Sequence, residues 1–250
     1  MAQKRVALVT GASAGIGKSA ALALLKNGYH VALVARRKDL LEKVAADSGA
    51  KERALALPAD ITKDDQVKAV FAKTKSTFGR LDVLFNNAGM GAPAVPMEEL
   101  PIEKFREVVN LNLVAMFMCA QEAIRIMKAQ DPKGGRIINN GSISAHAPRP
   151  MSVAYTSTKH AVTGLTKCIS LDGRKNDITA SQIDIGNALT DLAARMAQGV
   201  PQADGSVRPE PLMDVKHVGE AVLHMANLPL DVNVQFMTIM ATKMPFVGRG

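Results

Sequence analysis

The chain alternates short apolar runs with longer segments in which apolar residues recur every three or four positions. The runs predict β-strands and the periodic segments predict helices. Strands are expected at residues 6–10, 30–35, 54–57, 81–85, 136–140, 179–185 and 234–239, and helices at 16–27, 40–47, 64–78, 111–130, 154–171 and 215–226. Strict alternation of this kind predicts a doubly wound, Rossmann-like parallel sheet in a three-layer α/β/α arrangement. We expect residues 1–250 to form a single domain.

Composition narrows the class of protein. The 250 residues are 47% hydrophobic and 22% charged, which suits a globular enzyme and not a disordered chain. No apolar run approaches the roughly 20 residues of a membrane-spanning helix, and the first residues lack a signal-peptide pattern. We therefore expect no membrane association and a cytoplasmic location. The two cysteines exclude a disulfide framework, and we expect no metal.

The net charge of +8 raises the question of a nucleic-acid partner. The longest basic run has three residues, Arg36, Arg37 and Lys38, and the chain has no tryptophan to stack on bases. We therefore expect no nucleic acid. A small phosphorylated ligand explains the local basic run more simply.

Ligands of doubly wound sheets bind beyond the carboxyl ends of the strands, and the first such loop here is rich in glycine. Gly11, Gly15 and Gly17 have the spacing G-x-x-x-G-x-G and lead into the first helix at Ile16. Free N–H groups at a helix start favour an anion, so the loop predicts a pyrophosphate site. The alternative is an ordinary tight turn between strand and helix.

The next strand ends in residues that bear on the choice of cofactor. About 20 residues beyond the glycines, where an acidic residue would bind the ribose of NAD, stand Ala35, Arg36 and Arg37. Arginine binds phosphate through two hydrogen bonds and stays charged. We therefore expect NADP(H) over NAD(H), with Arg36 binding the 2′-phosphate and Arg37 and Ser13 assisting. The alternative is that both arginines are solvated charges at a helix start.

A tyrosine and a lysine four residues apart supply candidate acid–base chemistry. Tyr155 and Lys159 fall in a predicted helix, where positions i and i+4 share a face. A free phenol is a poor acid or base at neutral pH, and a fixed cation beside it favours the phenolate. The pair alone is a weak signal, because chance produces it in many chains of this composition.

Together these residues resemble the short-chain dehydrogenase/reductase family, over nearly the whole chain. The motifs that carry the resemblance are Thr10-Gly11-x-x-x-Gly15-x-Gly17, Asp60, Asn86-Asn87-Ala88-Gly89, Asn112, Ser142 and Tyr155 with Lys159. The resemblance implies hydride transfer between a nicotinamide and a small-molecule carbonyl or alcohol, in a homotetramer or homodimer. A non-catalytic protein that senses NADP(H) on the same fold is the alternative, and a 3-oxoacyl thioester reductase is a specific enzyme alternative.

The resemblance also implies roles for individual residues. Tyr155 would donate or accept the substrate proton, Lys159 would favour the phenolate and hold the nicotinamide ribose, Ser142 would bind the substrate oxygen, and Asn112 would hold a water. Asp60 would touch the adenine. Further cofactor contacts would come from Ile61, Asn87, Ala88, Gly89, Gly186 and Thr190. Simpler readings remain open: Ser142 ends its strand, Asn112 is a surface residue, and Asp60 caps the next helix.

Three departures from the family pattern concern the substrate pocket and subunit contacts. Asp184-Ile185-Gly186 replaces the usual Pro-Gly, Ala115 stands where glycine is common, and the last strand lacks the frequent Gly-Gly. We expect residues 188–213 to form a substrate lid, with a plain surface insertion as the alternative. Candidate pocket walls are Met90, His146, Met151 and Ala188, although a lone loop histidine is usually solvated.

Overall fold

Seven parallel strands form the central sheet of the computed structural model, which describes residues 4–190 and 198–247. Their order across the sheet is β3-β2-β1-β4-β5-β6-β9. The strands are β1 (Val6–Thr10), β2 (His30–Ala35), β3 (Ala54–Pro58), β4 (Val83–Asn86), β5 (Gly135–Asn140), β6 (Ile178–Ile185) and β9 (Phe236–Ile239). The order reverses direction between β1 and β4, which confirms the predicted doubly wound, Rossmann-like fold.

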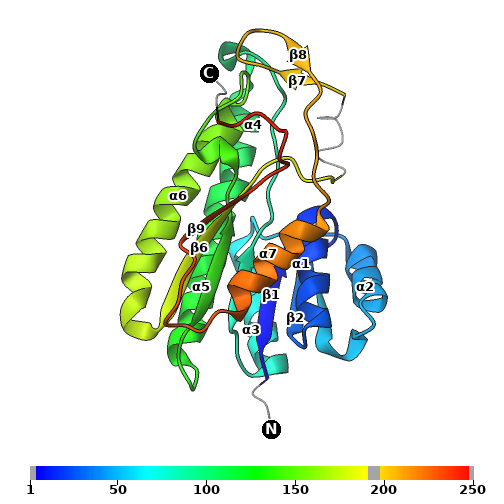
Figure 1. Ribbon diagram of the computed structural model, residues 1–250. Helices are drawn as coiled ribbons and strands as arrows, with labels where there is room; N and C mark the ends of the chain where they lie inside the picture. The colour runs from blue at the N-terminus through cyan, green and yellow to red at the C-terminus, as the bar shows by residue number, and fades with distance from the viewer. Residues whose placement is uncertain (1–3, 191–197, 248–250) are drawn as a thin grey trace.

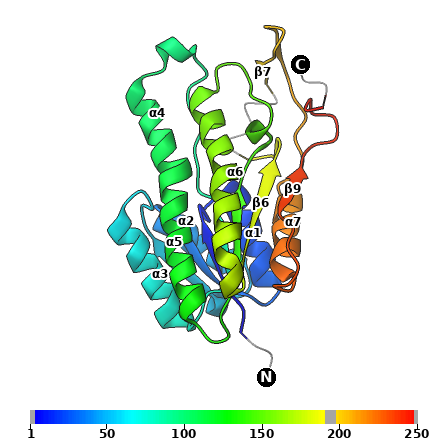
Figure 2. The same cartoon turned by 90° about the vertical axis from the view of Figure 1, so that its left-hand side faces the viewer.

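Helices cover both faces of this sheet (Figures 1 and 2). One face carries α1 (Gly15–Lys26), α2 (Lys38–Asp47) and α7 (Lys216–Asn227), and the other carries α3 (Asp64–Phe78), α5 (Ala115–Ala129) and α6 (Val153–Gly173). Alternate residues of β1 enter different cores: Ala7 and Val9 pack toward α1, whereas Val6 and Leu8 pack toward α3 and α5. Burial on both faces explains why β1 is almost continuously apolar.

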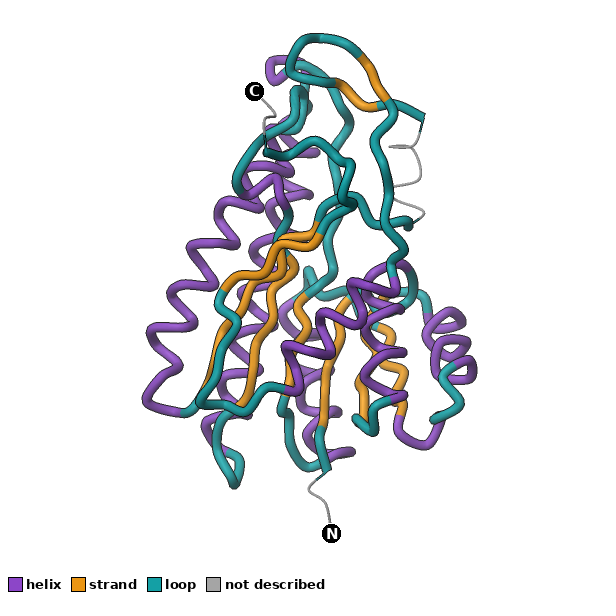
Figure 3. Tube along the Cα trace, viewed as in Figure 1, coloured by secondary structure: helices purple, strands orange, loops and turns teal. Residues whose placement is uncertain are grey.

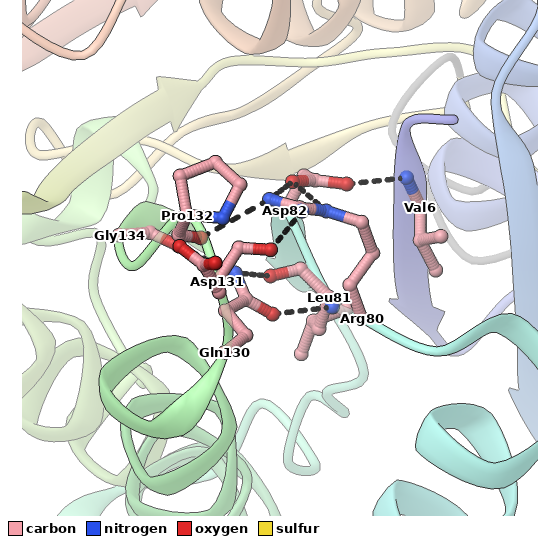
Figure 4. A network of polar contacts seen from close by, with 8 residues as sticks. All are labelled: Val6, Arg80, Leu81, Asp82, Gln130, Asp131, Pro132 and Gly134. Carbon is pink, nitrogen blue, oxygen red and sulfur yellow. Dashed lines mark hydrogen bonds and ion pairs between the residues drawn. The ribbon is translucent and has the colours of Figure 1, made fainter. Parts of the chain in front are cut away.

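A polar network joins residues at the amino-terminal ends of β1 and β4 to the residues after α5 (Figure 4). The carboxylate of Asp82 accepts from the Val6 N–H at 2.7 Å and from Arg80 Nε at 2.8 Å. Gln130, after α5, accepts from the Leu81 N–H at 2.9 Å and donates to the Leu81 carbonyl at 3.0 Å. These contacts tie β4 to β1 and to the end of α5.

The predicted helix at 111–130 begins too late. Helix α4 (Ile102–Val109) precedes it, and a π-helical turn at Asn110–Val114 joins α4 to α5. The apolar residues Ile102, Phe105, Val108 and Val109 recur at helical spacing, so the sequence carried the signal for α4 and the prediction missed it. By length and composition the whole stretch Ile102–Ala129 could cross a membrane, which is weak evidence because a core helix passes the same test. Here α5 packs on α3, β4 and β5.

The other predicted elements agree with the structure to within two residues at each end. A small hairpin of β7 (Val200–Pro201) and β8 (Val207–Arg208) was not predicted. It lies above the carboxyl ends of the strands, among the loops that gather there (Figure 3). The hairpin belongs to the predicted lid at 188–213, of which residues 191–197 lie outside the described residues.

Neither cysteine belongs to a polar site. Burial raises the pKa of the Cys119 thiol to about 12, so it stays protonated and unreactive, while Cys168 is exposed on α6. Within residues 4–190 and 198–247, no three His, Cys, Asp or Glu side chains gather to ligate a metal.

Candidate active site

Polar side chains link the carboxyl ends of β1, β4 and β5. Thr10 Oγ1 accepts from the N–H groups of Asn87 and Ala88 at 2.8 and 3.0 Å. Asn87 Nδ2 donates to the Thr10 carbonyl at 2.9 Å, and Asn140 Nδ2 donates to Asn87 Oδ1 at 2.8 Å. The glycine loop after Thr10 is therefore held in a fixed position relative to the ends of β4 and β5.

Lys159 continues this chain of contacts into α6. Its buried ammonium donates to the Asn140 carbonyl at 2.7 Å and lies 5.4 Å from the centroid of the Tyr155 ring. The two side chains project from successive turns of α6, as the spacing of four residues predicts. The structure therefore places a buried ammonium beside the phenol ring.

Ser142 lies where β5 ends and a 3₁₀ turn, Ile143–Ala145, begins. Its N–H donates to Asp184 Oδ1 at 3.0 Å, and its Oγ accepts from the Ser144 N–H at 3.1 Å. Because Oγ is the acceptor in that bond, the hydroxyl proton is available to a substrate oxygen. The reading of Ser142 as a strand end is wrong: β5 ends at Asn140, and Ser142 caps the 3₁₀ turn and also presents a donor.

Asn112 is buried in the π-helical turn and holds the main chain after β4. Its Oδ1 accepts from the Met90 N–H at 2.8 Å, and its Nδ2 donates to the Met90 carbonyl at 2.9 Å and to Thr158 Oγ1 at 3.3 Å. The reading of Asn112 as a surface residue is wrong. Its role in holding a water stays a prediction.

A cleft of about 510 Å³ runs along these strand ends. Its walls include Gly11, Gly15, Ile16, Gly17, Arg37, Asn87, Ala88, Gly89, Met90, Tyr155, Lys159, Gly186, Ala188 and Thr190. A Cβ on Gly17 would lie 2.7 Å from Asn87 Nδ2 and would clash with the Gly11 carbonyl, so the first turn of α1 requires glycine at this position. The cradle of bare backbone at the start of α1 fits a dinucleotide pyrophosphate.

Four predicted cofactor contacts lie outside the walls of this cleft. Arg36 is exposed, whereas Arg37 reaches the cleft and donates to Ser13 Oγ at 3.5 Å. Asp60 accepts from the Thr62 hydroxyl at 2.7 Å, a bond that lowers the pKa of the carboxyl, and it does not cap α3. Ile61 is buried in the core beside α3. Their contacts with a cofactor stay predictions.

A second cavity, of about 270 Å³, opens beside the cleft. Its walls include Ser142, Ile143, Arg149, Pro150, Met151, Tyr155, Ile185, Gly186, Asn187, Val200 and Pro201. Tyr155, Ile185, Gly186 and Asn187 line both spaces, so the tyrosine stands where the two meet. This is the geometry that a proton donor between cofactor and substrate requires.

The residues predicted to line the substrate pocket are divided between the smaller cavity and the larger cleft. Met151 lines the smaller cavity, whereas Met90 and Ala188 line the larger cleft. His146 lines neither: its Nε2 lies 2.8 Å from Asp184 Oδ2, and its ring meets Phe246 edge to face. The histidine therefore braces the turn after Ser142 from outside the cavity.

The sequence analysis did not predict the set of buried polar residues beside the cavity. Asp184 stands in the segment that departs from the family pattern, and that departure was its only signal. Arg149, Asn187 and Glu210 come from three loops that only the folded chain brings together. No spacing along the chain relates them.

Comparison with known proteins identifies the family. The family model described as short chain dehydrogenase matches residues 5–200. The 3beta-hydroxysteroid dehydrogenase of Mediterraneibacter gnavus is 34% identical over 198 residues, which cover 79% of this chain and 71% of that protein. The chain therefore belongs to the short-chain dehydrogenase/reductase family. It is accordingly an oxidoreductase that acts on alcohol or carbonyl substrates with a nicotinamide cofactor.

Solved structures agree with this assignment. A 3-ketoacyl-(acyl-carrier-protein) reductase from Brucella melitensis, complexed with NADH, superimposes with a TM-score of 0.84 at 27% sequence identity. The superposition covers 96% of this chain and 98% of the reductase chain. An alcohol dehydrogenase from Thermococcus sibiricus, complexed with 5-hydroxy-NADP, gives 0.83 at 27% identity and covers 97% and 99%. One relative binds the unphosphorylated cofactor and the other an analogue of the phosphorylated one.

Proposed function

We propose that the protein is an NADP(H)-dependent oxidoreductase that interconverts a small carbonyl compound and its alcohol, with Tyr155 as general acid and base. The observation that carries this proposal is the position of Tyr155 at the junction of the glycine-lined cleft and the smaller cavity. A substrate carbonyl in the cavity would lie between the phenol and the cofactor. Positioning of this kind supplies much of the rate.

Other residues of the site have separate roles in the proposed reaction. When bound, the nicotinamide supplies or accepts the hydride. In the direction of reduction, Tyr155 gives its proton to the substrate oxygen, while the Ser142 hydroxyl donates a hydrogen bond to the same oxygen. Lys159, held by Asn140, stabilises the phenolate that forms. Asn112 keeps the backbone at Met90 in place beside the cleft.

Purified protein should consume NADPH in the presence of some member of a panel of ketones, diketones, quinones, sugars and 3-oxoacyl thioesters. Absorbance at the nicotinamide band measures the rate, and NADH is run in parallel. Tight binding of NADPH without turnover of any compound would contradict the enzyme proposal and favour a protein that senses the cofactor.

Replacing Arg36 should weaken the preference for the phosphorylated cofactor. Loss of a charge-assisted hydrogen bond to the 2′-phosphate removes about 1.5–3 kcal/mol of binding, which is about 10-fold or more in affinity. We expect the ratio of kcat/KM for NADPH to that for NADH to fall by about 10-fold in Arg36→Ala and by less in Arg37→Ala.

The matched control is Lys38→Ala, which removes the next charge of the same basic run. Lys38 is exposed and pairs with Glu42, so its loss should leave the ratio unchanged. An unchanged ratio in both arginine variants would sink the assignment of NADP(H). A larger fall in Arg37→Ala than in Arg36→Ala would shift the main phosphate contact to the arginine that lines the cleft.

Two further features extend the proposal. The segment 188–213 would cover the bound substrate, since Val200 and Pro201 of the hairpin already line the cavity. The exposed face of α5 and α6, which presents Phe117 and Leu171, would pack against another copy in a homotetramer or homodimer. Light scattering after size-exclusion chromatography tests the assembly, and a monomer would contradict it.

A further inference from the structure

The smaller cavity has a mixed wall. Of the residues that line it, eight are alanine, isoleucine, proline, methionine or valine, three are glycine and six are polar. Ser142 and Tyr155 supply the groups that would bind the reacting oxygen. Across the described ranges 4–190 and 198–247, Arg149 is the one charged side chain in the wall. The contribution of the wall itself to the field inside the cavity therefore depends on how the charge of Arg149 is compensated.

Glu210 compensates that charge from behind the wall. Its Oε2 forms an ion pair with Arg149 Nη2 and also accepts from Asn187 Nδ2 at 2.7 Å. Arg149 Nη2 donates in addition to Asn187 Oδ1 at 3.0 Å. The amide of Asn187, which lines both the cavity and the cleft, thus contacts both members of the pair.

The ion pair is part of the folded structure and not a surface contact. Glu210 is 3% exposed, and the side chain of Arg149 is 15% exposed. Gln202, in the hairpin segment over the cavity, donates to Glu210 Oε1 at 3.1 Å. A carboxylate with this little contact with water cannot leave its partner without a large cost in desolvation. The guanidinium is therefore neutralised whenever the hairpin is in place.

An anionic substrate would meet unfavourable electrostatics here. Its carboxylate would lose water on entering the cavity, and the nearest cation already has a buried counter-ion. Glu210, directly behind that cation, would repel it. A compact uncharged substrate avoids both costs, and the volume of about 270 Å³ lies below the range of about 300–1,000 Å³ that suits drug-sized ligands.

We propose that the Arg149–Glu210 pair makes this pocket selective for compact, uncharged alcohols and ketones, and that Glu210 is the specificity-determining residue. The inference rests on the proposed function, since it places the substrate in the cavity beside Tyr155. It also predicts how to weaken the selectivity. Loss of the Glu210 charge removes the repulsion that a carboxylate substrate meets behind the wall.

The test compares two ketones of the same shape, 4-oxocyclohexanecarboxamide and 4-oxocyclohexanecarboxylate, with NADPH in excess. Wild-type protein should show a kcat/KM at least 10-fold higher for the amide. In Glu210→Gln, which keeps the size of the side chain and one of its two acceptor oxygens, this ratio should fall by at least 10-fold. The double variant Arg149→Gln/Glu210→Gln should gain less activity toward the carboxylate than Glu210→Gln, because the positive charge in the wall is lost together with the negative charge behind it.

Glu98→Gln serves as the matched control, because it removes an exposed carboxylate that does not belong to the cavity wall and should leave the ratio unchanged. Equal use of both ketones by wild type, or an unchanged ratio in folded Glu210→Gln, would overturn the proposal. Circular dichroism and NADPH binding verify folding. Should Glu210→Gln fail to fold, the wild-type ratio alone decides.

A second readout separates this inference from the proposed function. Turnover of neither ketone would count against reduction of such compounds, while the charge selectivity is still measured through binding. Cyclohexanecarboxamide and cyclohexanecarboxylate cannot react, and calorimetry with NADPH-saturated protein gives their affinities. Binding of the amide at least 10-fold tighter supports the selectivity. Equal affinities, tighter binding of the carboxylate, or binding of neither would overturn it.

Discussion

Replacing Tyr155 with phenylalanine should lower kcat by about 1,000-fold for any carbonyl substrate that the wild-type protein reduces. The variant lacks the phenol hydroxyl and therefore cannot give a proton to the substrate oxygen. General acid catalysis of this kind contributes about 10²–10⁴-fold to the rate. Lys159 keeps its bond to the Asn140 carbonyl, and the glycine loop is untouched. The Kd for NADPH should therefore change by less than about 3-fold. Stopped-flow turnover and fluorescence titration measure the two quantities.

The chain supplies its own control for this substitution, because it contains only one other tyrosine. Tyr29 is buried in the core, where its hydroxyl donates to the Ala226 carbonyl at 3.0 Å. Tyr29→Phe removes the same atom and should cost about 1 kcal/mol of stability with no change in kcat. If Tyr155→Phe kept more than a tenth of wild-type turnover, the assignment of Tyr155 as acid and base would be wrong.

The parts of the molecule that the sequence predicted well are those set by local rules. Parallel strands buried on both faces must be apolar throughout, so Val6–Thr10 and its neighbours were visible as runs. The glycines of the first loop were visible because a bare backbone must bend there, and Tyr155 with Lys159 because a helix places them on one face. Each of these signals lies within a few consecutive residues.

The parts that escaped prediction depend on contacts between distant segments. Asp184 is the residue before the last of the buried strand β6. At such a position, local sequence patterns predict an apolar residue. Asp184 is tolerated because Ser142, Gln182 and His146 all approach its two oxygens. Glu210 and Arg149 are 61 positions apart and meet only when the hairpin folds over the cavity. Such pairs leave no periodicity to detect.

Replacing Gly141 with alanine should unfold or strongly destabilise the protein, by about 3–5 kcal/mol. A Cβ at this position would overlap Asp184 Oδ1 and would lie 2.8 Å from both Cγ and Nε2 of Gln182. Overpacking of a tight core costs about 1–3 kcal/mol, and displacement of a buried, fully hydrogen-bonded carboxylate adds to it. Urea denaturation at a fixed protein concentration gives the change in the free energy of unfolding.

A double-mutant cycle identifies the source of the effect. Asp184→Ala should itself be destabilising, because Gln182 and the Ser142 N–H lose an acceptor. In that background, however, Gly141→Ala no longer meets the carboxylate and should cost less than half of what it costs in the wild type. Additive costs would show that the new methyl group clashes elsewhere. The cycle therefore measures directly how the unusual acid of β6 constrains the strand end that presents Ser142, since Gly141 must stay bare for Asp184 to reach the Ser142 N–H.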